Sequence, residues 1–224
     1  MHPGLLGLSS DLLLPVLAGI CFVAMVLGGV LITPHNALRS RGGAKLPMPV
    51  LGNRPILQVE LARDDEDLRS VLLAGDVKQN LQDAKIGNRL DNFLFVPAYS
   101  GFLLALGLLL ASSDNRFARL AFLLAVLVVP VIAVCDWLEN LGITPTIGHI
   151  ESNGAPESGD AVRISFPSII KWCLIAGVLI GYALVSLSNV SLPYGILGLL
   201  LLAIGAIVAI TMARYLRLRF WARY

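Results

Sequence analysis

The chain has 224 residues, of which 56% are hydrophobic and only 14% are charged, with a formal net charge of +2. A soluble domain carries about 25% charged residues, so this composition excludes an ordinary water-soluble globule. The small net charge does not indicate nucleic-acid binding. The three cysteines, Cys21, Cys135 and Cys173, have the spacing of neither a disulfide framework nor a zinc site.

Five stretches are long and apolar enough to cross a bilayer as helices, because about 20 apolar residues span the hydrocarbon layer. They cover residues 12–33, 92–111, 117–135, 168–188 and 193–213. The first lacks the basic leader of a signal peptide and is expected to be a retained span. We predict an all-α fold, a polytopic transmembrane helix bundle of about five spans with a small cytoplasmic juxtamembrane segment.

The predicted spans divide the chain into five consecutive parts. The first transmembrane helix takes 1–33, a cytoplasmic segment with short helices takes 34–90, a transmembrane hairpin of helices 2 and 3 takes 91–141, a cytoplasmic loop takes 142–166, and a hairpin of helices 4 and 5 with a basic aromatic tail takes 167–224. The stretches 112–116 and 188–192 are short enough to force antiparallel neighbours.

The distribution of Lys and Arg predicts the orientation. Of the 17 such residues, all but Arg116 and Arg119 fall on the side of the two long connections and the C-terminus. Basic residues in short loops mark the cytoplasmic side. We therefore expect a multi-pass protein of a bacterial inner (plasma) membrane, with its N-terminus outside and its C-terminus in the cytoplasm.

The segment 34–90 has signals of local structure. Residues 57–61 alternate apolar and polar, which favours a short strand. The acids of 64–67 stand before an apolar pattern of helical spacing, which indicates the start of a helix. Gly75 is expected to end that helix, and a second helix should begin at Asp76 and run toward the second span.

The chain has no Gly-rich phosphate loop, no His-Glu-x-x-His and no Gly-x-Ser-x-Gly, so its sequence indicates no established catalytic site and does not identify a cofactor. The topology instead predicts a polar cluster near the cytoplasmic leaflet. Its members come from helices 2, 3 and 4, where residues three or four apart share a face. The candidate ligand-binding residues are Asp91, Phe95, Tyr99, Asp136, Glu139, Asn140 and Lys171.

Two interpretations of this cluster are open. Asp91 is expected to open helix 2, where a carboxylate caps the helix, whereas Asp136 and Glu139 should lie in the last turns of helix 3. A negative charge at that end costs about 0.3–1 kcal/mol when exposed, unless a partner such as Lys171 or Arg89 offsets it. The cluster is then either a structural ion-pair network or a site for a ligand, a metal or a proton.

Three further features have mainly structural interpretations. Gly177 and Gly181 allow close helix approach, within the bundle or in a homodimer. Pro97 and Pro130 are expected to kink helices 2 and 3. The basic and aromatic tail, 214–224, is expected to anchor at the headgroup level and to attract anionic lipid.

Three motifs carry a resemblance: Glu60-Leu61-Ala62, Asp91-x-x-x-Phe95-x-x-x-Tyr99, and Asp136-x-x-Glu139-Asn140. Through them, the part of the chain from about 60 to 140 resembles a group of uncharacterised bacterial multi-spanning membrane proteins. The resemblance implies an architecture and no reaction. The stretch 34–55 looks like an insertion relative to that pattern.

The leading hypothesis is a non-catalytic integral membrane protein that serves as an accessory or scaffolding subunit of a membrane complex. The alternative is a membrane-embedded ligand-binding protein, an enzyme or a transporter that uses the cytoplasmic-side carboxylates for a lipid, a cation or a proton. Expected partners are the lipid bilayer and either a membrane protein or a second copy of the chain.

Overall fold

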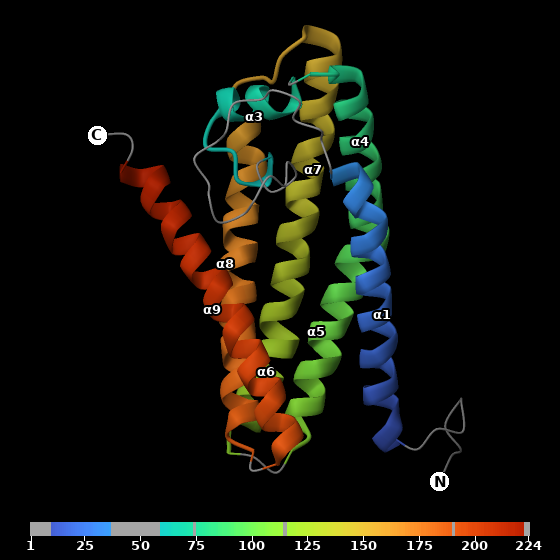
Figure 1. The fold of residues 1–224 in the computed structure, drawn as a ribbon, viewed down its shortest axis with the longest axis vertical. Helices are drawn as coiled ribbons and strands as arrows, with labels where there is room; N and C mark the ends of the chain where they lie inside the picture. The colour runs from blue at the N-terminus through green and yellow to red at the C-terminus, as the bar shows by residue number, and fades with distance from the viewer. Residues whose placement is uncertain (1–9, 37–58, 74, 114–115, 190, 222–224) are drawn as a thin grey trace.

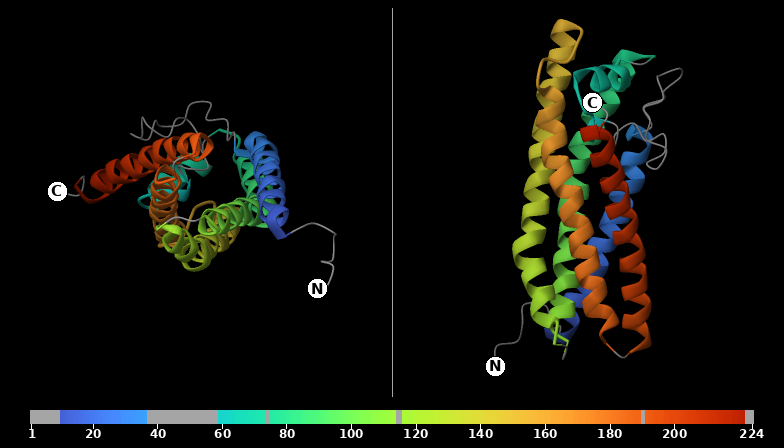
Figure 2. Two further views of the ribbon diagram at one scale, coloured as in Figure 1. Left: turned by 90° about the horizontal axis from the view of Figure 1, so that it is seen from below. Right: turned by 90° about the vertical axis from the view of Figure 1, so that its left-hand side faces the viewer.

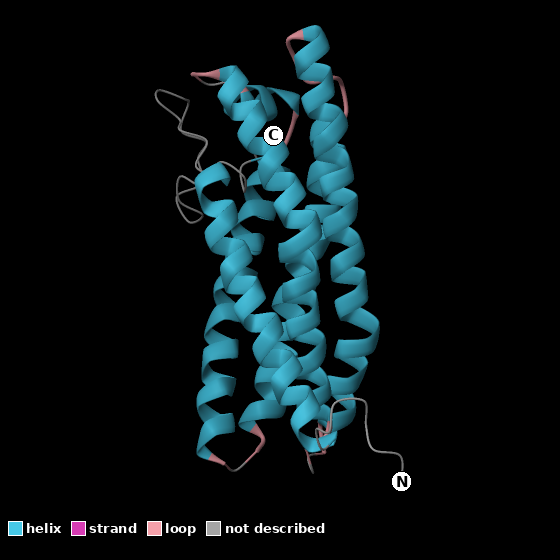
Figure 3. Ribbon diagram, turned by 90° about the vertical axis from the view of Figure 1, so that its right-hand side faces the viewer, coloured by secondary structure: helices cyan, strands magenta, loops and turns pink. Residues whose placement is uncertain are grey.

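In the computed structural model, the described residues are 10–36, 59–73, 75–113, 116–189 and 191–221. Figure 3 shows them as helices joined by loops, with no strand among them. Five helical stretches are long and apolar enough to cross a membrane. The predicted all-α bundle of five spans is therefore confirmed, and the chain is a multi-pass integral membrane protein.

The spanning helices run side by side along the long axis of the molecule (Figure 1). The helix α1 (Ser10–Asn36) packs along α5 (Val96–Ala111), and α5 contacts α7 (Val129–Asn153). The helix α8 (Asp160–Leu187) lies between α7 and α9 (Leu192–Trp221). The two views in Figure 2 show the same neighbours along and across the bundle.

The two ends of the bundle differ in character. One end, here called the turn end, holds the connections from α5 to α6 (Ala118–Leu123) and from α8 to α9 (Figure 1). The opposite end, the polar end, carries α3 (Asp65–Leu72) and the connection from α7 to α8. The described chain starts at the turn end and finishes toward the polar end, as an odd number of spans requires.

Two of the spans contain a π-helical turn directly before a proline. The turn η1 (Asp91–Phe95) joins α4 (Val77–Leu90) to α5 and precedes Pro97. The turn η2 (Leu124–Val128) joins α6 to α7 and precedes Pro130. Proline has no N–H and its ring clashes with the carbonyl four residues earlier, so a wider turn accommodates it. The kinks at Pro97 and Pro130 stay a prediction, whereas the π-helical turns before them are observed.

The helices next to the polar end are longer than the sequence indicates. The predicted loop 142–166 is wrong over most of its length, because α7 continues to Asn153 and α8 already begins at Asp160. The polar composition of 148–163 suggests a loop. However, α7 continues into this stretch and has a buried face formed by Ile143, Ile147 and Ile150. The true connection turns at Gly154 and Gly159, whose φ angles of 74° and 94° suit glycine.

The small helices of the polar end begin where the acids predict. Asp64 caps α3 by accepting a hydrogen bond from the Asp67 N–H, and Asp76 caps α4 by accepting one from Gln79. Gly75, with φ 65°, separates the two helices. The predicted strand is wrong where it can be compared, since residues 59–60 are helical, while Leu57 and Gln58 lie outside the described residues.

Two large apolar cores and one small one hold the described residues together. The core of the bundle includes Leu106, Ile132 and Tyr182, which are almost fully buried. A second core at the polar end packs Leu68 and Leu72 of α3 against α7 and α8. The outward faces of the long helices are apolar and exposed, as expected for surfaces that contact lipid.

Candidate functional site

Helix α7 directs three polar side chains into the bundle. Asp136, Glu139 and Asn140 share one face and each is at most 3% exposed. They lie in the middle of α7 and not in its last turns, because the helix continues to Asn153. The predicted unfavourable position at a helix C-terminus is therefore wrong, and their burial is what requires compensation.

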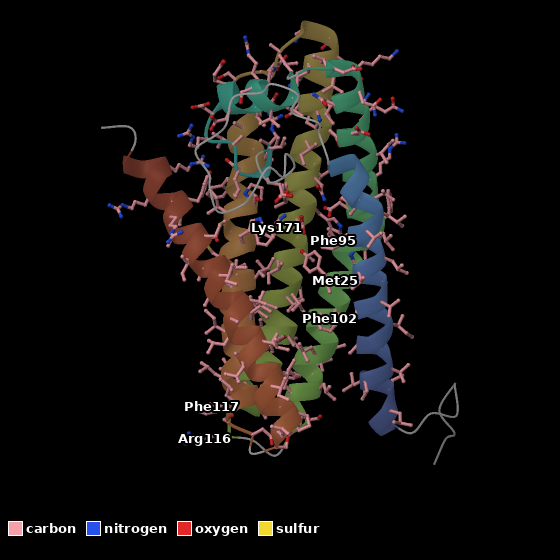
Figure 4. The ribbon with its side chains drawn as sticks, in the orientation of Figure 1. Met25, Phe95, Phe102, Arg116, Phe117 and Lys171 are labelled. Atoms are coloured by element: carbon pink, nitrogen blue, oxygen red, sulfur yellow. The ribbon has the colours of Figure 1, made fainter. Side chains whose placement is uncertain are left out.

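Lys171 of α8 supplies that compensation. Its Nζ lies 2.8 Å from Asp136 Oδ1, 2.7 Å from Glu139 Oε2 and 3.6 Å from Glu60 Oε2. The predicted pairing of the carboxylates with Lys171 is confirmed, whereas Arg89, the other candidate, is exposed on α4. Lys171 lies in the half of the molecule toward the polar end, far from Arg116 at the turn end (Figure 4). We call Glu60, Asp136, Glu139 and Lys171 the lysine cluster.

Helix α5 and the turn η1 close the lysine cluster on another side. Tyr99 Oη donates a 2.6 Å hydrogen bond to Asp136 Oδ2. The Phe95 ring lies against the Tyr99 ring, with 5.4 Å between their centroids. Asp136 thus accepts hydrogen bonds from both Tyr99 and Lys171, which fixes the orientation of its carboxylate.

Asp91 reaches this region through Asn140. Asn140 Nδ2 donates to Asp91 Oδ2 at 2.6 Å and to Asn92 Oδ1 at 3.3 Å. The sequence predicts Asp91 at the start of a helix, and this prediction is wrong because α4 runs directly into η1. It sits in the first position of the π-helical turn, and such turns are frequent at functional sites.

Glu60 is the member of the lysine cluster that is absent from the candidate residues predicted from the sequence. It lies in a helical turn before α3, 111 positions from Lys171, and accepts a 3.2 Å hydrogen bond from Trp172 Nε1. Burial raises the pKa of the Glu60 carboxyl above its usual range, although the Lys171 ammonium opposes the rise. The only signal for it in the sequence is its place in the motif Glu60-Leu61-Ala62.

The three motifs noted in the sequence therefore meet at one place. Each motif contributes to the surroundings of Lys171. The first supplies the carboxylate of Glu60. The second supplies Asp91, Phe95 and Tyr99, and the third supplies Asp136, Glu139 and Asn140. All seven candidate residues come together, and the tight hairpin of helices 2 and 3 accounts for six of them.

The chemistry of the lysine cluster follows from its charges. One ammonium faces three carboxylates, so full ionisation would leave two uncompensated negative charges. Glu139 Oε2 is buried, and its partner among the described residues is the Lys171 ammonium, whose Nζ lies 2.7 Å away. Among the described residues, no three His, Cys, Asp or Glu side chains are placed to hold a metal ion.

The C-terminal end of α9 is more firmly integrated than its composition suggests. Tyr215 is buried in a small core with Leu61 and Met212 instead of lying at a surface. Arg219 Nη1 donates to Tyr215 Oη at 2.6 Å and to Ser165 Oγ at 3.0 Å. Arg214 and Arg217 are exposed and remain free to face headgroups, while residues 222–224 lie outside the described part.

The two glycines of α8 have different environments. A Cβ at Gly181 would collide with Leu124 of η2, so this glycine serves packing within the chain. Gly177 is exposed with open space around it.

Comparison of the chain with models of protein families, with curated proteins and with solved structures found no match.

Proposed function

We propose that the chain is a proton-binding, multi-pass protein of a bacterial inner membrane, in which the lysine cluster takes up and releases protons. The N-terminus lies outside, and the polar end lies in the cytoplasm. The bias of Lys and Arg toward the polar end and its connections supports this orientation.

The excess of buried carboxylates carries the proposal. Moving an ion out of water costs several kcal/mol even after the protein relaxes, and an opposite charge, hydrogen bonds or a proton can offset that cost. Lys171 can neutralise one carboxylate of the lysine cluster, and two protons would neutralise the others. Ionisable groups inside membrane proteins commonly bind ions or protons.

Infrared spectroscopy of the reconstituted protein tests the proposal, since a protonated carboxyl group has a carbonyl band that a carboxylate lacks. The wild type should show this band at pH 7, and it should weaken in Glu139→Gln and in Asp136→Asn. Glu66→Gln, whose side chain is exposed on α3, is the matched control and should leave the band unchanged. A wild type without the band, or a band of undiminished intensity in both cluster variants, would overturn the proposal.

A second candidate is an accessory or scaffolding subunit in which the lysine cluster is structural. The observation that favours it is the saturation of Lys171, which already has two carboxylates within 2.8 Å and a third at 3.6 Å. Native mass spectrometry of the gently purified wild type and of the Asp136→Asn/Glu139→Gln variant separates the candidates. A protein partner retained by both forms supports the subunit, whereas a lone chain in both forms counts against it.

The exposed arginines of α9 support a contact with anionic lipid. Arg214 and Arg217 are exposed on the last turns of a long apolar helix. Each basic residue near an anionic surface contributes about 1 kcal/mol to binding. We expect Arg214→Gln/Arg217→Gln to retain less anionic lipid in native mass spectra than the wild type does. Equal retention would remove these residues from the contact.

A further inference from the structure

A row of polar side chains connects the surface with the lysine cluster along the contact between α4–η1 and α7. Asn88 Nδ2 donates to Thr144 Oγ1 and to the Asn140 carbonyl, both at 3.1 Å. One turn deeper, Asn140 Nδ2 donates to Asp91 Oδ2 and to Asn92 Oδ1. We call this row, formed by Asn88, Asp91, Asn92, Asn140 and Thr144, the polar seam.

The exposed end of the polar seam is Thr144, and its other members are partly or fully buried. Thr144 is exposed, Asp91 and Asn92 are partly buried, and Asn140 is 3% exposed. Asp136, one helical turn from Asn140 on α7, is likewise 3% exposed. Asp91 is thus the carboxylate that lies between the exposed end of the polar seam and the buried carboxylates.

The polar seam contains one buried hydrogen-bond acceptor without a donor among the described residues. Asn88 is 7% exposed, and its Oδ1 has no hydrogen-bond partner among the described residues. Buried polar atoms of this kind usually bind ordered water. A water on Asn88 Oδ1 would lie inside the row of hydrogen bonds that leads to Asp91, and water beside a carboxylate can exchange protons with it.

Asp91 is linked to the lysine cluster through Asn140, which donates to it and stands one helical turn from Asp136 on α7. The charges that act on Asp91 come from Asp136, from Lys171 of α8 and from Glu60 of the turn before α3. Asp91 therefore feels the charge of the same carboxylates and the same ammonium that make up the lysine cluster. A proton on Asp91 and a proton within the lysine cluster influence each other directly.

We propose that Asp91 relays protons between solvent at the exposed end of the polar seam and the lysine cluster. In one transfer, the Asp91 carboxylate accepts a proton from solvent and becomes neutral. It then releases that proton to a carboxylate of the lysine cluster and is a carboxylate again. One O–H bond breaks as another forms, and the net change is one proton moved. This relay rests on the proton binding proposed above.

Exchange of the buried proton for deuterium tests the relay. Transfer of reconstituted protein into D₂O shifts the carbonyl band of a protonated carboxyl group, and the rate of the shift reports proton access. Asp91→Asn should leave the intensity of the band near that of the wild type and slow its shift about a hundredfold, the low end of what a positioned proton-transferring group contributes. Asp91→Glu, which restores a carboxyl group, should exchange at nearly the rate of the wild type.

The outcomes separate this inference from the proton binding on which it rests. Exchange of Asp91→Asn at the rate of the wild type, with the band present, would overturn the relay and leave proton binding intact. Absence of the band in the wild type would overturn both. If Asp91→Asn fails to fold, Asn88→Leu provides a second test. It removes the acceptor for water and should also slow exchange. Glu66→Gln is the control for removing a carboxylate elsewhere.

Discussion

Lys171 carries the positive charge on which three buried carboxylates converge, so its loss leaves charges without compensation. We expect Lys171→Met to lower the free energy of unfolding by about 3–5 kcal/mol at pH 7, as for other broken buried ion pairs. At acidic pH the loss should be smaller, because protonated carboxyl groups no longer need the ammonium. Unfolding of the purified protein in mixed micelles, followed by circular dichroism, measures both values.

The exposed Lys78 of α4 provides the matched control for this experiment. Lys78→Met removes the same charge and should change the free energy of unfolding by less than about 0.5 kcal/mol. An equal loss for Lys171→Met at neutral and acidic pH would assign its effect to packing and not to charge.

Asp67 links α3 to the residue before its cap. Burial opposes ionisation of Asp67, but hydrogen bonds from the Arg63 guanidinium and N–H outweigh it and hold the pKa of the Asp67 carboxyl below its usual range. A lowered pKa in the folded state stabilises the protein above the pKa of the unfolded state, about 3.9. This contribution is lost as the pH falls through the folded-state value.

We therefore expect Asp67→Asn to be less stable than the wild type by about 1–2 kcal/mol at pH 7, the scale of hydrogen bonds to a charged group. The difference should shrink as both proteins are acidified below about pH 4. Urea or detergent unfolding at a series of pH values measures it. A difference that stayed constant down to the lowest accessible pH would show that Asp67 acts through its shape alone.

At the scale of elements, close approach of α5 to α8 depends on a glycine. A Cβ at Gly107 would collide with Tyr182 Oη and would lie 2.7 Å from the Ala125 Cβ. The Tyr182 hydroxyl is held there by its hydrogen bond to the Leu103 carbonyl. We expect Gly107→Ala to lower the free energy of unfolding by about 1–3 kcal/mol, as overpacking does.

Gly148 in α7 is the control, because a Cβ there meets nothing within 4 Å. Gly148→Ala should be neutral or stabilising by up to about 1 kcal/mol, since alanine favours a helix over glycine. Thermal unfolding of both variants beside the wild type makes the comparison. Similar losses for the two variants would contradict the packing role of Gly107.

The apolar spans themselves and the helix starts at Asp64 and Asp76 could be predicted from the sequence. Each depends on a local property, namely a run of apolar residues or a carboxylate at a helix start. The ends of α7 and α8 could not, because residues 142–153 and 160–166 are polar on one side and bury the other in a core shared with α3 and α4. That burial depends on contacts with distant parts of the chain, which the local composition does not reveal.

At the scale of the whole molecule, orientation can be measured directly. Ser112 and Ser188 lie at the turn end and Ser158 at the polar end. After replacement of the three native cysteines, a membrane-impermeant maleimide should label Ser112→Cys and Ser188→Cys in intact spheroplasts. Ser158→Cys should react only after permeabilisation. Labelling of Ser158→Cys in intact spheroplasts would reverse the proposed orientation.

The sequence by itself determined the class of the protein, its five spans and the seven residues Asp91, Phe95, Tyr99, Asp136, Glu139, Asn140 and Lys171 that gather in the bundle. Antiparallel helices joined by short turns fix which residues share a depth, so the pattern of one helix constrains its neighbour. Only the tertiary structure brought Glu60 to Lys171 and placed Asp136 and Glu139 in the middle of α7. The reason is physical: the position of residues 59–60 depends on packing at the polar end, and contacts between distant residues have no periodicity to reveal them.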